Sequence, residues 1–442
     1  MVRYWKLNCS VLDDRAYVRL IENTVENVNS LTLLDKQRWW DVFLTAVRSK
    51  TIFYTKQKHF VETTTRDLLR RDLLRLEAVP PDQLTPDQSA LYGFLKEKLR
   101  LFEETQIEGY RRRTRGLPRY EQSEPDIAFY ANLEKRSAQK GVIGELKDHT
   151  GRVFSDSAHL LPIADRFYRE LYTPAVTSTP TQDKPLANID RKISLAHRQM
   201  LDAEFTEQEL QKAVLDLNDE KSPGIDGISA EFYKKFWYLL HAHFADFINA
   251  AKTSSFHSTK NTSVTALIYK EKGEVNDLMN YRPISLLNVD LKILSKALTN
   301  RLKCVLPSVI HHTQTAVDGR RIDHTVHMLR DFIQLANNDN LESAFIFLDQ
   351  EKAFDRVDHA FLFRTMKAFG IGESFLNWIR QLYSNATTRV KVNGFLTDNI
   401  PLLRGVRQGC PLSPLLCLLL KSWPYSYVRI PILSVLRLGV KK

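Results

Sequence analysis

Residues 345–357 read Phe345-Ile-Phe-Leu-Asp-Gln-Glu-Lys-Ala-Phe-Asp-Arg-Val357, an uninterrupted apolar run that leads directly into a carboxylate. A run of this kind, rich in aromatic residues and isoleucine, predicts a buried strand over residues 345–348. Asp349 would then lie at the end of the strand, where its side chain can reach solvent and a metal ion. The alternative is a core strand followed by a polar turn with a helix-capping aspartate. This stretch alone does not choose between the two.

The composition is that of an ordinary globular protein with a basic excess. Hydrophobic residues make up 43% and charged residues 26% of the 442 residues, so a packed core and two to four domains are expected. The net charge of +11 favours an anionic partner, although a merely soluble basic protein shares it. The four cysteines show no zinc-site spacing or disulfide framework, and no secretory or membrane-spanning run is found. We therefore expect an intracellular protein that is not secreted.

Residues 1–115 predict a helical N-terminal region. Leucines recur at helical spacing over residues 68–76, and a second apolar stripe covers residues 91–102. Pro80 and Pro81 separate the two stripes and end the first helix. We expect two antiparallel helices that pack through these stripes.

Residues 116–200 are expected to form a connecting region. Residues 127–133 and 142–146 alternate weakly and predict short strands or helix ends, and residues 163–171 predict a short helix. Proline and threonine are frequent in residues 173–188, which predicts a linker.

Five arginines fall within residues 111–119. Such a run is often only a solvated face, but in a basic chain contact with phosphate is a fair alternative. Phosphate contacts would make binding fall steeply with salt. The candidate nucleic-acid-binding residues here are Arg111, Arg112, Arg113 and Arg115.

Residues 201–340 predict helices separated by shaped loops. Thr206 and Glu209 have the spacing of a capping box and predict a strong helix start. Asp290 is expected to cap a later helix that Pro307 ends, and another helix is expected from about Asp323.

Four motifs occur in order along the chain. They are Lys221-Ser-Pro-Gly-Ile-Asp-Gly227, Asn280-Tyr-Arg-Pro-Ile-Ser-Leu286, Leu348-Asp-Gln-Glu-Lys-Ala-Phe-Asp355 and Gly405-Val-Arg-Gln-Gly-Cys-Pro-Leu-Ser-Pro414. Together they resemble the reverse transcriptase of LINE-type (non-LTR) retrotransposons. The resemblance implies an α+β fold in which residues 201–340 form the fingers and residues 341–417 form part of a right-hand palm, an antiparallel sheet backed by helices. It also implies that the endonuclease and the thumb of a full-length element are absent.

By this resemblance, the chemistry is RNA-directed DNA polymerisation. A primer hydroxyl attacks an α-phosphate, and two divalent ions stabilise the attacking and leaving oxygens. Mg²⁺ prefers oxygen ligands, so a cluster of carboxylates is required. The resemblance makes Asp349 the first catalytic aspartate and metal ligand, with the carbonyl of Gln350 as a second ligand. The expected partners are an RNA template, a DNA primer or target, and dNTPs, in the nucleus and the cytoplasm.

The resemblance assigns further residues to substrates. Phe354 matches the steric gate that selects deoxynucleotides, although a core position at a helix start is the alternative. Gln408 and Gly409 are expected to line the incoming nucleotide and template base. Arg282 would lie near the triphosphate and Arg407 near the template backbone, with a role in surface charge as the alternative for both arginines.

Two neighbours of the gate are expected to have a structural role. Lys352 and Asp355 are interpreted as ion-pair partners rather than catalysts.

The pattern departs from the family after Ser413. The family continues into a hairpin with Tyr-Ala-Asp-Asp, which completes the metal site, whereas residues 418–442 contain no aspartate or glutamate. We interpret these residues as a divergent tail of a truncated or frame-shifted element and expect the fragment to be inactive. The alternatives are a non-catalytic RNA-binding remnant and an unstable pseudogene product.

Overall fold

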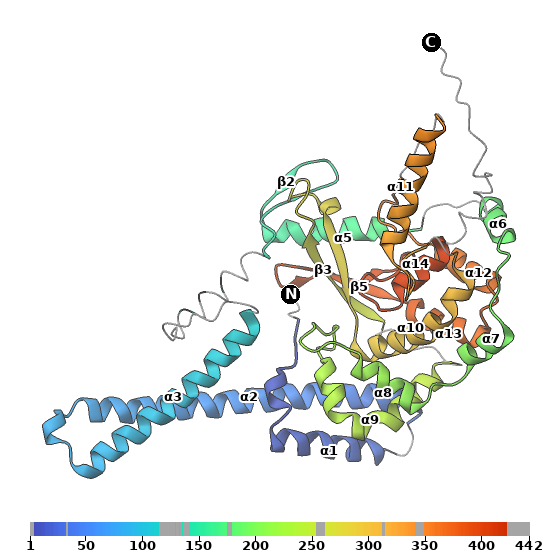
Figure 1. The fold of residues 1–442 in the computed structure, drawn as a ribbon. Coiled ribbons are helices and arrows are strands. Elements are labelled where there is room, and N and C mark those ends of the chain that lie inside the picture. Colours follow the sequence, from blue (N-terminus) through green and yellow to red (C-terminus); the bar gives the residue numbers. More distant parts are fainter. Residues whose placement is uncertain are drawn as a thin grey trace. The chain divides into compact units, whose positions relative to one another are not determined.

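The computed structural model describes residues 4–31, 34–114, 129, 132, 135, 141–174, 179–252, 261–311, 314–340 and 349–421 (Figure 1). The chain divides into two compact units. The first comprises residues 1–12, 22–44 and 145–442, and the second comprises residues 13–21 and 45–144. The predicted strand at residues 345–348 lies outside the described residues, as does the predicted short element at residues 127–133 apart from residues 129 and 132.

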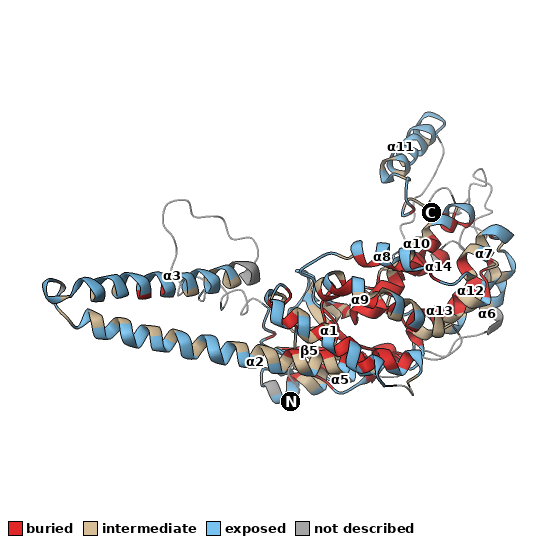
Figure 2. Ribbon diagram, turned by 90° about the horizontal axis from the view of Figure 1, so that it is seen from below, coloured by how far each residue is buried: buried red, intermediate tan, exposed pale blue. Residues whose placement is uncertain are grey.

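Helices dominate the N-terminal region, as the apolar spacing predicts. They are α1 (Arg15–Asn29), α2 (Lys36–Glu77) and α3 (Pro86–Thr114). Within the second unit, Arg70 of α2 lies 3.6 Å from Glu103 of α3, and Leu73 and Leu99 line a shared cavity. Since rising numbers on α2 meet falling numbers on α3, the two helices are antiparallel, and that prediction is confirmed. Much of α2 and α3 is nevertheless exposed (Figure 2).

The core of the first unit is helical. Its central helices are α8 (Glu207–Leu215), α9 (Ala230–Ala250) and α10 (Val289–Val309), and α8 packs against both others. The predicted capping box is present, since Thr206 accepts from the amide of Glu209 and the Glu209 side chain accepts from the amide of Thr206.

The predicted limits of α10 are wrong at both ends. The helix begins at Val289, so Asp290 lies inside the first turn and is fully buried. Its carboxylate accepts a hydrogen bond from the indole of Trp40 at 3.3 Å. Trp40 lies 250 residues away in the sequence, so local spacing does not predict this buried partner. Pro307 lies inside the helix, which continues to Val309.

A five-stranded sheet lies beside these helices. The strands are β3 (Thr262–Tyr269), β4 (Tyr281–Leu286), β5 (Thr387–Val392), β6 (Phe395–Leu396) and β7 (Ile400–Pro401), in the order β4-β3-β5-β6 with β7 also paired to β5. β3 pairs antiparallel with β4 and parallel with β5. Pro283 is tolerated because β4 is an edge strand. Helix α5 (Ser157–Tyr172) packs against β5 and β7 (Figure 1).

The remaining elements complete a mixed α+β fold. They are η1 (Cys9–Val11), η2 (Pro81–Gln83), β1 (Leu146–Lys147), β2 (Val153–Phe154), α6 (Thr179–Ala187), α7 (Leu195–Asp202), η3 (Leu278–Asn280), α11 (Ile322–Asn338), α12 (His359–Ala368), α13 (Glu373–Tyr383) and α14 (Ser413–Lys421). The predicted helix at residues 163–171 is confirmed but begins earlier, at Ser157. The prediction of a linker is wrong for residues 179–187, which form α6 and pack against α12.

Within the described part of the chain, no helix is long and apolar enough to cross a membrane.

Candidate functional site

Two loops that carry motif residues are joined directly through their backbones. The amide of Val406 donates to the carbonyl of Phe354 at 2.7 Å, and the amide of Gly405 donates to the carbonyl of Val357 at 2.7 Å. Gly405 has φ +91°, and a Cβ there would lie 2.8 Å from the carbonyl oxygen of Asp355. Only glycine fits this close approach, so the segment 354–357 fixes the position of the loop that begins at Gly405.

His359 adds a side-chain contact to the same junction. Its Nε2 lies 2.7 Å from the carbonyl oxygen of Gly405, and its ring lies 5.0 Å from that of Tyr383. Burial lowers the pKa of His359. The residue follows Asp358, which caps α12 by accepting from the amide of Phe361. Sequence reasoning did not select His359, because a histidine at a helix start carries no signal of a partner 46 residues away.

The same loop reaches the free side of strand β4. The amide of Ser285 donates to the carbonyl of Gln408 at 2.6 Å. Gly409 has φ +108°, and a Cβ there would lie 2.9 Å from the carbonyl oxygen of Ser285 and 3.4 Å from Ile284. Arg282 is exposed on the same strand, and its side chain shares the face of Ile284 because alternate residues of a strand point the same way. Gln408, Gly409 and Arg282 are thus brought to one edge of the sheet.

The first motif packs against the residues that follow β4. A Cβ at Gly224 would lie 2.2 Å from the backbone nitrogen of Asn288, and the amide of Asp226 donates to the Asn288 side chain at 3.3 Å. Lys292 also donates to the carbonyl of Ser222 at 2.9 Å. The fourth motif therefore contacts both the second and the third, and the first motif packs against the residues just after the second.

Comparison with known proteins identifies the family. Residues 268–423 match the family model described as reverse transcriptase (RNA-dependent DNA polymerase). The chain is 33% identical over 431 residues to the transposon TX1 uncharacterized 149 kDa protein of Xenopus laevis. The match covers 95% of this chain and 33% of the relative. The chain carries a reverse transcriptase domain of the non-LTR retrotransposon type.

Shorter matches agree with this assignment. The chain is 32% identical over 156 residues to the retrovirus-related Pol polyprotein from type-1 retrotransposable element R2 of Popillia japonica, covering 34% of this chain and 21% of the relative. It is 29% identical over 154 residues to the RNA-directed DNA polymerase from mobile element jockey of Drosophila melanogaster, covering 34% and 17%. The chain thus spans a third or less of the length of these relatives.

The candidate metal ligands of the reverse transcriptase domain are accessible but few. Asp349 and Gln350 are both exposed, and they offer the oxygen donors that Mg²⁺ prefers. Across the residues with a described placement, no group of three His, Cys, Asp or Glu side chains could hold a metal ion. The donor set in this part of the chain is therefore too small for a two-ion site.

Phe354 is half-buried, in the turn that connects Asp349 to α12. Beside it, Asp355 is buried, and burial raises the pKa of its carboxyl to about 6 against the opposing effect of Lys352. The expected ion pair between Lys352 and Asp355 does not form. The Lys352 ammonium is buried without a hydrogen-bond partner, 4.6 Å from the ring centroid of Phe167.

Of the arginines expected to bind nucleic acid, only Arg407 has a described side chain. Arg407 is only 4% exposed and donates to the carbonyl of Asn261 at 2.7 Å, and burial lowers its pKa. This placement favours an internal role for Arg407 over the expected template contact. Arg111, Arg112 and Arg113 lie in α3 with side chains outside the described set, and Arg115 lies outside the described residues altogether.

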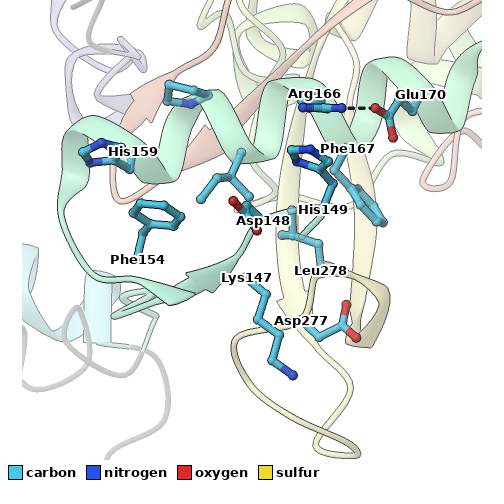
Figure 3. A pocket seen from close by; sticks show the side chains of 12 residues that line it. Lys147, Asp148, His149, Phe154, His159, Arg166, Phe167, Glu170, Asp277 and Leu278 are labelled. Atoms are coloured by element: carbon cyan, nitrogen blue, oxygen red, sulfur yellow. Dashed lines mark hydrogen bonds and ion pairs between the residues drawn. The ribbon is translucent and has the colours of Figure 1, made fainter. Parts of the chain in front are cut away.

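A cavity of about 490 Å³ opens between the β1–β2 hairpin, α5 and the turn before β4 (Figure 3). Phe154 and His159 stack at one end with ring centroids 5.0 Å apart, and Arg166 pairs with Glu170 on the α5 side. Phe167 also lines this cavity. The ring that faces Lys352 is therefore shared between the cavity wall and the gate turn.

Proposed function

We propose that the chain forms the fingers and part of the palm of an RNA-directed DNA polymerase, with residues 201–340 as fingers and residues 341–417 as partial palm. Its substrates would be a template RNA, a DNA primer or target, and dNTPs. The observation that carries this proposal is a set of backbone hydrogen bonds. They join residues 354–357 to the loop 405–409, and the same loop is bonded to β4 through Ser285 and Gln408. This junction supports the proposal because it joins the segments that carry the residues expected to meet the incoming nucleotide.

Each residue would act on a different part of that nucleotide. Phe354 would lie under the sugar and exclude a 2′-hydroxyl, while Gln408 and Gly409 would line the base. Arg282, exposed on the adjacent strand, would meet the triphosphate, for which the planar guanidinium is well suited. Asp349 and the carbonyl of Gln350 would contribute oxygen ligands to Mg²⁺.

Nucleotide binding and phosphoryl transfer make different demands on the chain. Two-metal catalysis needs several carboxylates to hold both ions in register. Residues 418–442 provide none, and Asp349 alone does not hold two ions. A polypeptide of this sequence would therefore bind the substrates of the polymerase without transferring the nucleotide. The role of Arg111, Arg112, Arg113 and Arg115 in RNA binding stays a prediction.

Nucleotide selectivity tests the proposed function without relying on catalysis. Binding of dATP and ATP to the purified protein would be measured by calorimetry, alone and with a primer–template duplex. We expect wild-type protein to bind dATP more tightly than ATP, and Phe354→Ala to remove the difference by making room for the 2′-hydroxyl.

Phe332→Ala provides a matched control, because Phe332 is 40% exposed on α11 and belongs to none of the motifs. It should keep the preference for dATP. Equal affinities for the two nucleotides in wild-type protein would refute the proposed gate.

A further inference from the structure

The ammonium of Lys352 is a buried cation without a hydrogen-bond partner. Its nearest aromatic neighbour is Phe167, whose ring centroid lies 4.6 Å from Nζ. A ring face attracts a cation, but it does not replace the hydrogen bonds that an ammonium makes with water. Removing an ion from water without pairing it is unfavourable, so most buried charges are paired. The ammonium of Lys352 is therefore a positive charge without a hydrogen-bonded counterpart in this structure.

Three cationic side chains surround the single carboxylate of Asp355. Lys270, Lys352 and Arg356 all act electrostatically on Asp355. Arg356 pairs with Glu351 at 2.9 Å, and the Lys270 ammonium donates to the carbonyl of Met279 at 2.9 Å. Lys352 has no equivalent bond. The excess of positive charge at this place favours an anionic ligand.

The backbone holds Lys352 in an unusual conformation. Its φ is +50°, in the left-handed region that residues with a Cβ seldom adopt. Such conformations persist where the surroundings impose them, and they concentrate at ligand sites. Lys352 lies in the turn of residues 351–356, which follows Asp349, the candidate metal ligand, and contains Phe354, the candidate gate.

We propose that Lys352 binds the phosphate groups of a nucleoside triphosphate, which draw its ammonium away from the ring of Phe167. The inference rests on the proposed function, because it assigns a phosphate-binding residue to the same nucleotide site. The flexible four-carbon stem allows the charge to move, and an ammonium with three donors suits phosphate oxygens. Arg282 and Lys352 would then hold the triphosphate from two separate elements, β4 and the gate turn.

A structural role for Lys352 makes the opposite prediction for stability. If the ammonium holds Phe167 and Asp355 in place, Lys352→Met should lower the melting temperature. If Lys352 is kept for a ligand, replacing an unpaired buried charge with an apolar side chain should raise it, because function and stability then conflict. We expect a rise of about 2 °C or more, the size that follows from roughly 1 kcal/mol in a unit of this size.

The same variant should weaken phosphate binding. Inorganic tripolyphosphate serves as the probe, because it carries the phosphate groups without base or sugar. We expect Lys352→Met to lower its affinity about tenfold or more, as the loss of a charge-assisted hydrogen bond implies. Phe167→Leu removes the facing ring and should leave this affinity intact.

Lys234→Met is the matched control. Its side chain is partly buried, but its ammonium is paired, with the carbonyl of Leu217 at 2.6 Å and the carboxylate of Asp219 at 2.7 Å. Its loss should lower the melting temperature and leave tripolyphosphate binding unchanged.

Three results would decide between the inference and its rivals. A lower melting temperature for Lys352→Met with unchanged tripolyphosphate affinity overturns the inference. Wild-type protein that prefers dATP, with Lys352→Met binding it equally well, overturns the inference and leaves the proposed function standing. Binding of tripolyphosphate that depends on Lys352, without a preference for dATP over ATP, would support a phosphate-binding role for Lys352 and overturn the proposed gate.

Discussion

The amide of Val406 donates to the carbonyl of Phe354 at 2.7 Å, and this bond joins the turn that carries the candidate gate to the loop that carries Gln408. The bond is made between backbones, so it does not depend on the identity of either side chain. The bond requires that the two backbone segments approach closely, and Gly405 allows that approach. The geometry of the candidate nucleotide site should therefore depend on Gly405.

Gly405→Ala should destabilise the first unit more than alanine at a comparable glycine. The new Cβ would lie 2.8 Å from the carbonyl oxygen of Asp355, and φ is +91°. We expect a loss of about 2–4 kcal/mol in the free energy of unfolding, since strain of φ and displacement of a backbone add together. Urea unfolding followed by tryptophan fluorescence measures it.

Gly394 is the control for this experiment. Its φ of +88° is nearly the same, but a Cβ there would meet nothing within 4 Å. Gly394→Ala should therefore show only the cost of the positive φ, about 1 kcal/mol. Equal losses for the two variants would mean that the close approach at Gly405 contributes nothing.

His359→Ala should loosen the loop that begins at Gly405. The imidazole Nε2–H donates to the carbonyl of Gly405, and alanine leaves that acceptor without this donor. We expect hydrogen exchange at the amides of Gly405 and Val406 to quicken about threefold to tenfold, which corresponds to the loss of one hydrogen bond of 0.5–1.5 kcal/mol. Mass spectrometry of exchanged peptides covers this segment.

His359→Gln should restore part of the protection, because its amide is also a donor. His241→Ala is the control, since His241 of α9 pairs with Glu207 of α8 and does not contact Gly405. If the alanine and glutamine variants exchange at the same rate, the hydrogen bond to Gly405 is not what holds the loop.

The local elements followed from the sequence more reliably than the contacts between them. The capping box at Thr206 depends on neighbouring residues, and it formed as expected. Strand β4 was not predicted, because Pro283 argues against a strand unless the strand is known to lie at an edge. Edge position is a property of the sheet and not of the segment.

The candidate site shows the same division. The motifs indicated which residues belong together, but not how they are linked. The bond between Ser285 and Gln408 and the contact of His359 with Gly405 join residues far apart in the chain, and no local spacing encodes them. Lys352 and Arg407 differ from expectation because their burial and pairing depend on residues far along the chain, Phe167 of α5 and Asn261 just before β3.

Arg301→Lys should destabilise the helical core strongly. Arg301 is 5% exposed and forms a two-pronged contact with Glu209, with both distances 2.8 Å, while also donating to the carbonyl of Glu204 at 2.8 Å. Its guanidinium lies 3.9 Å from the ring centroid of Phe205. An ammonium cannot reproduce the planar fork, so we expect a loss of about 3 kcal/mol or more in urea unfolding.

Arg100→Lys provides the comparison for Arg301. Arg100 also pairs with two carboxylates, Glu97 and Glu104, but its side chain is 56% exposed on α3. Solvent screens such pairs, and the expected change is at most about 0.5–1 kcal/mol. A similar loss for both variants would show that burial of Arg301 is not the source of its contribution.

The stability of the first unit should depend on pH through Asp355. Burial raises the pKa of this carboxyl from 3.8 to about 6, so the folded protein holds the proton more tightly than the unfolded chain. The resulting stability is fully present below pH 4 and is lost as the pH rises through about 6. Asp355→Asn removes the penalty of the buried charge and should stabilise the protein at pH 7.5 by up to about 3 kcal/mol.

The pH dependence separates this effect from a change in packing. At pH 4.5 the wild-type carboxyl is already largely protonated in the folded state, so the gain from Asp355→Asn should be much smaller. Urea midpoints at pH 4.5 and pH 7.5 give the comparison. A gain that is equal at both pH values, or a loss at pH 7.5, would contradict the inference that the charged form of Asp355 is disfavoured by burial.

Purified protein of this sequence should not extend a primer on an RNA template, even where it binds dNTPs. Positioning and neutralisation of developing charge supply most of the catalysis in phosphoryl transfer, and both need the full set of metal-bound carboxylates. Asp349 is exposed and offers one such group, while residues 418–442 offer none. Extension would be measured with labelled primer, dNTPs and Mg²⁺, beside an active reverse transcriptase as positive control. Mg²⁺-dependent incorporation by wild-type protein that Asp349→Asn abolishes would show that carboxylates elsewhere in the chain complete the site.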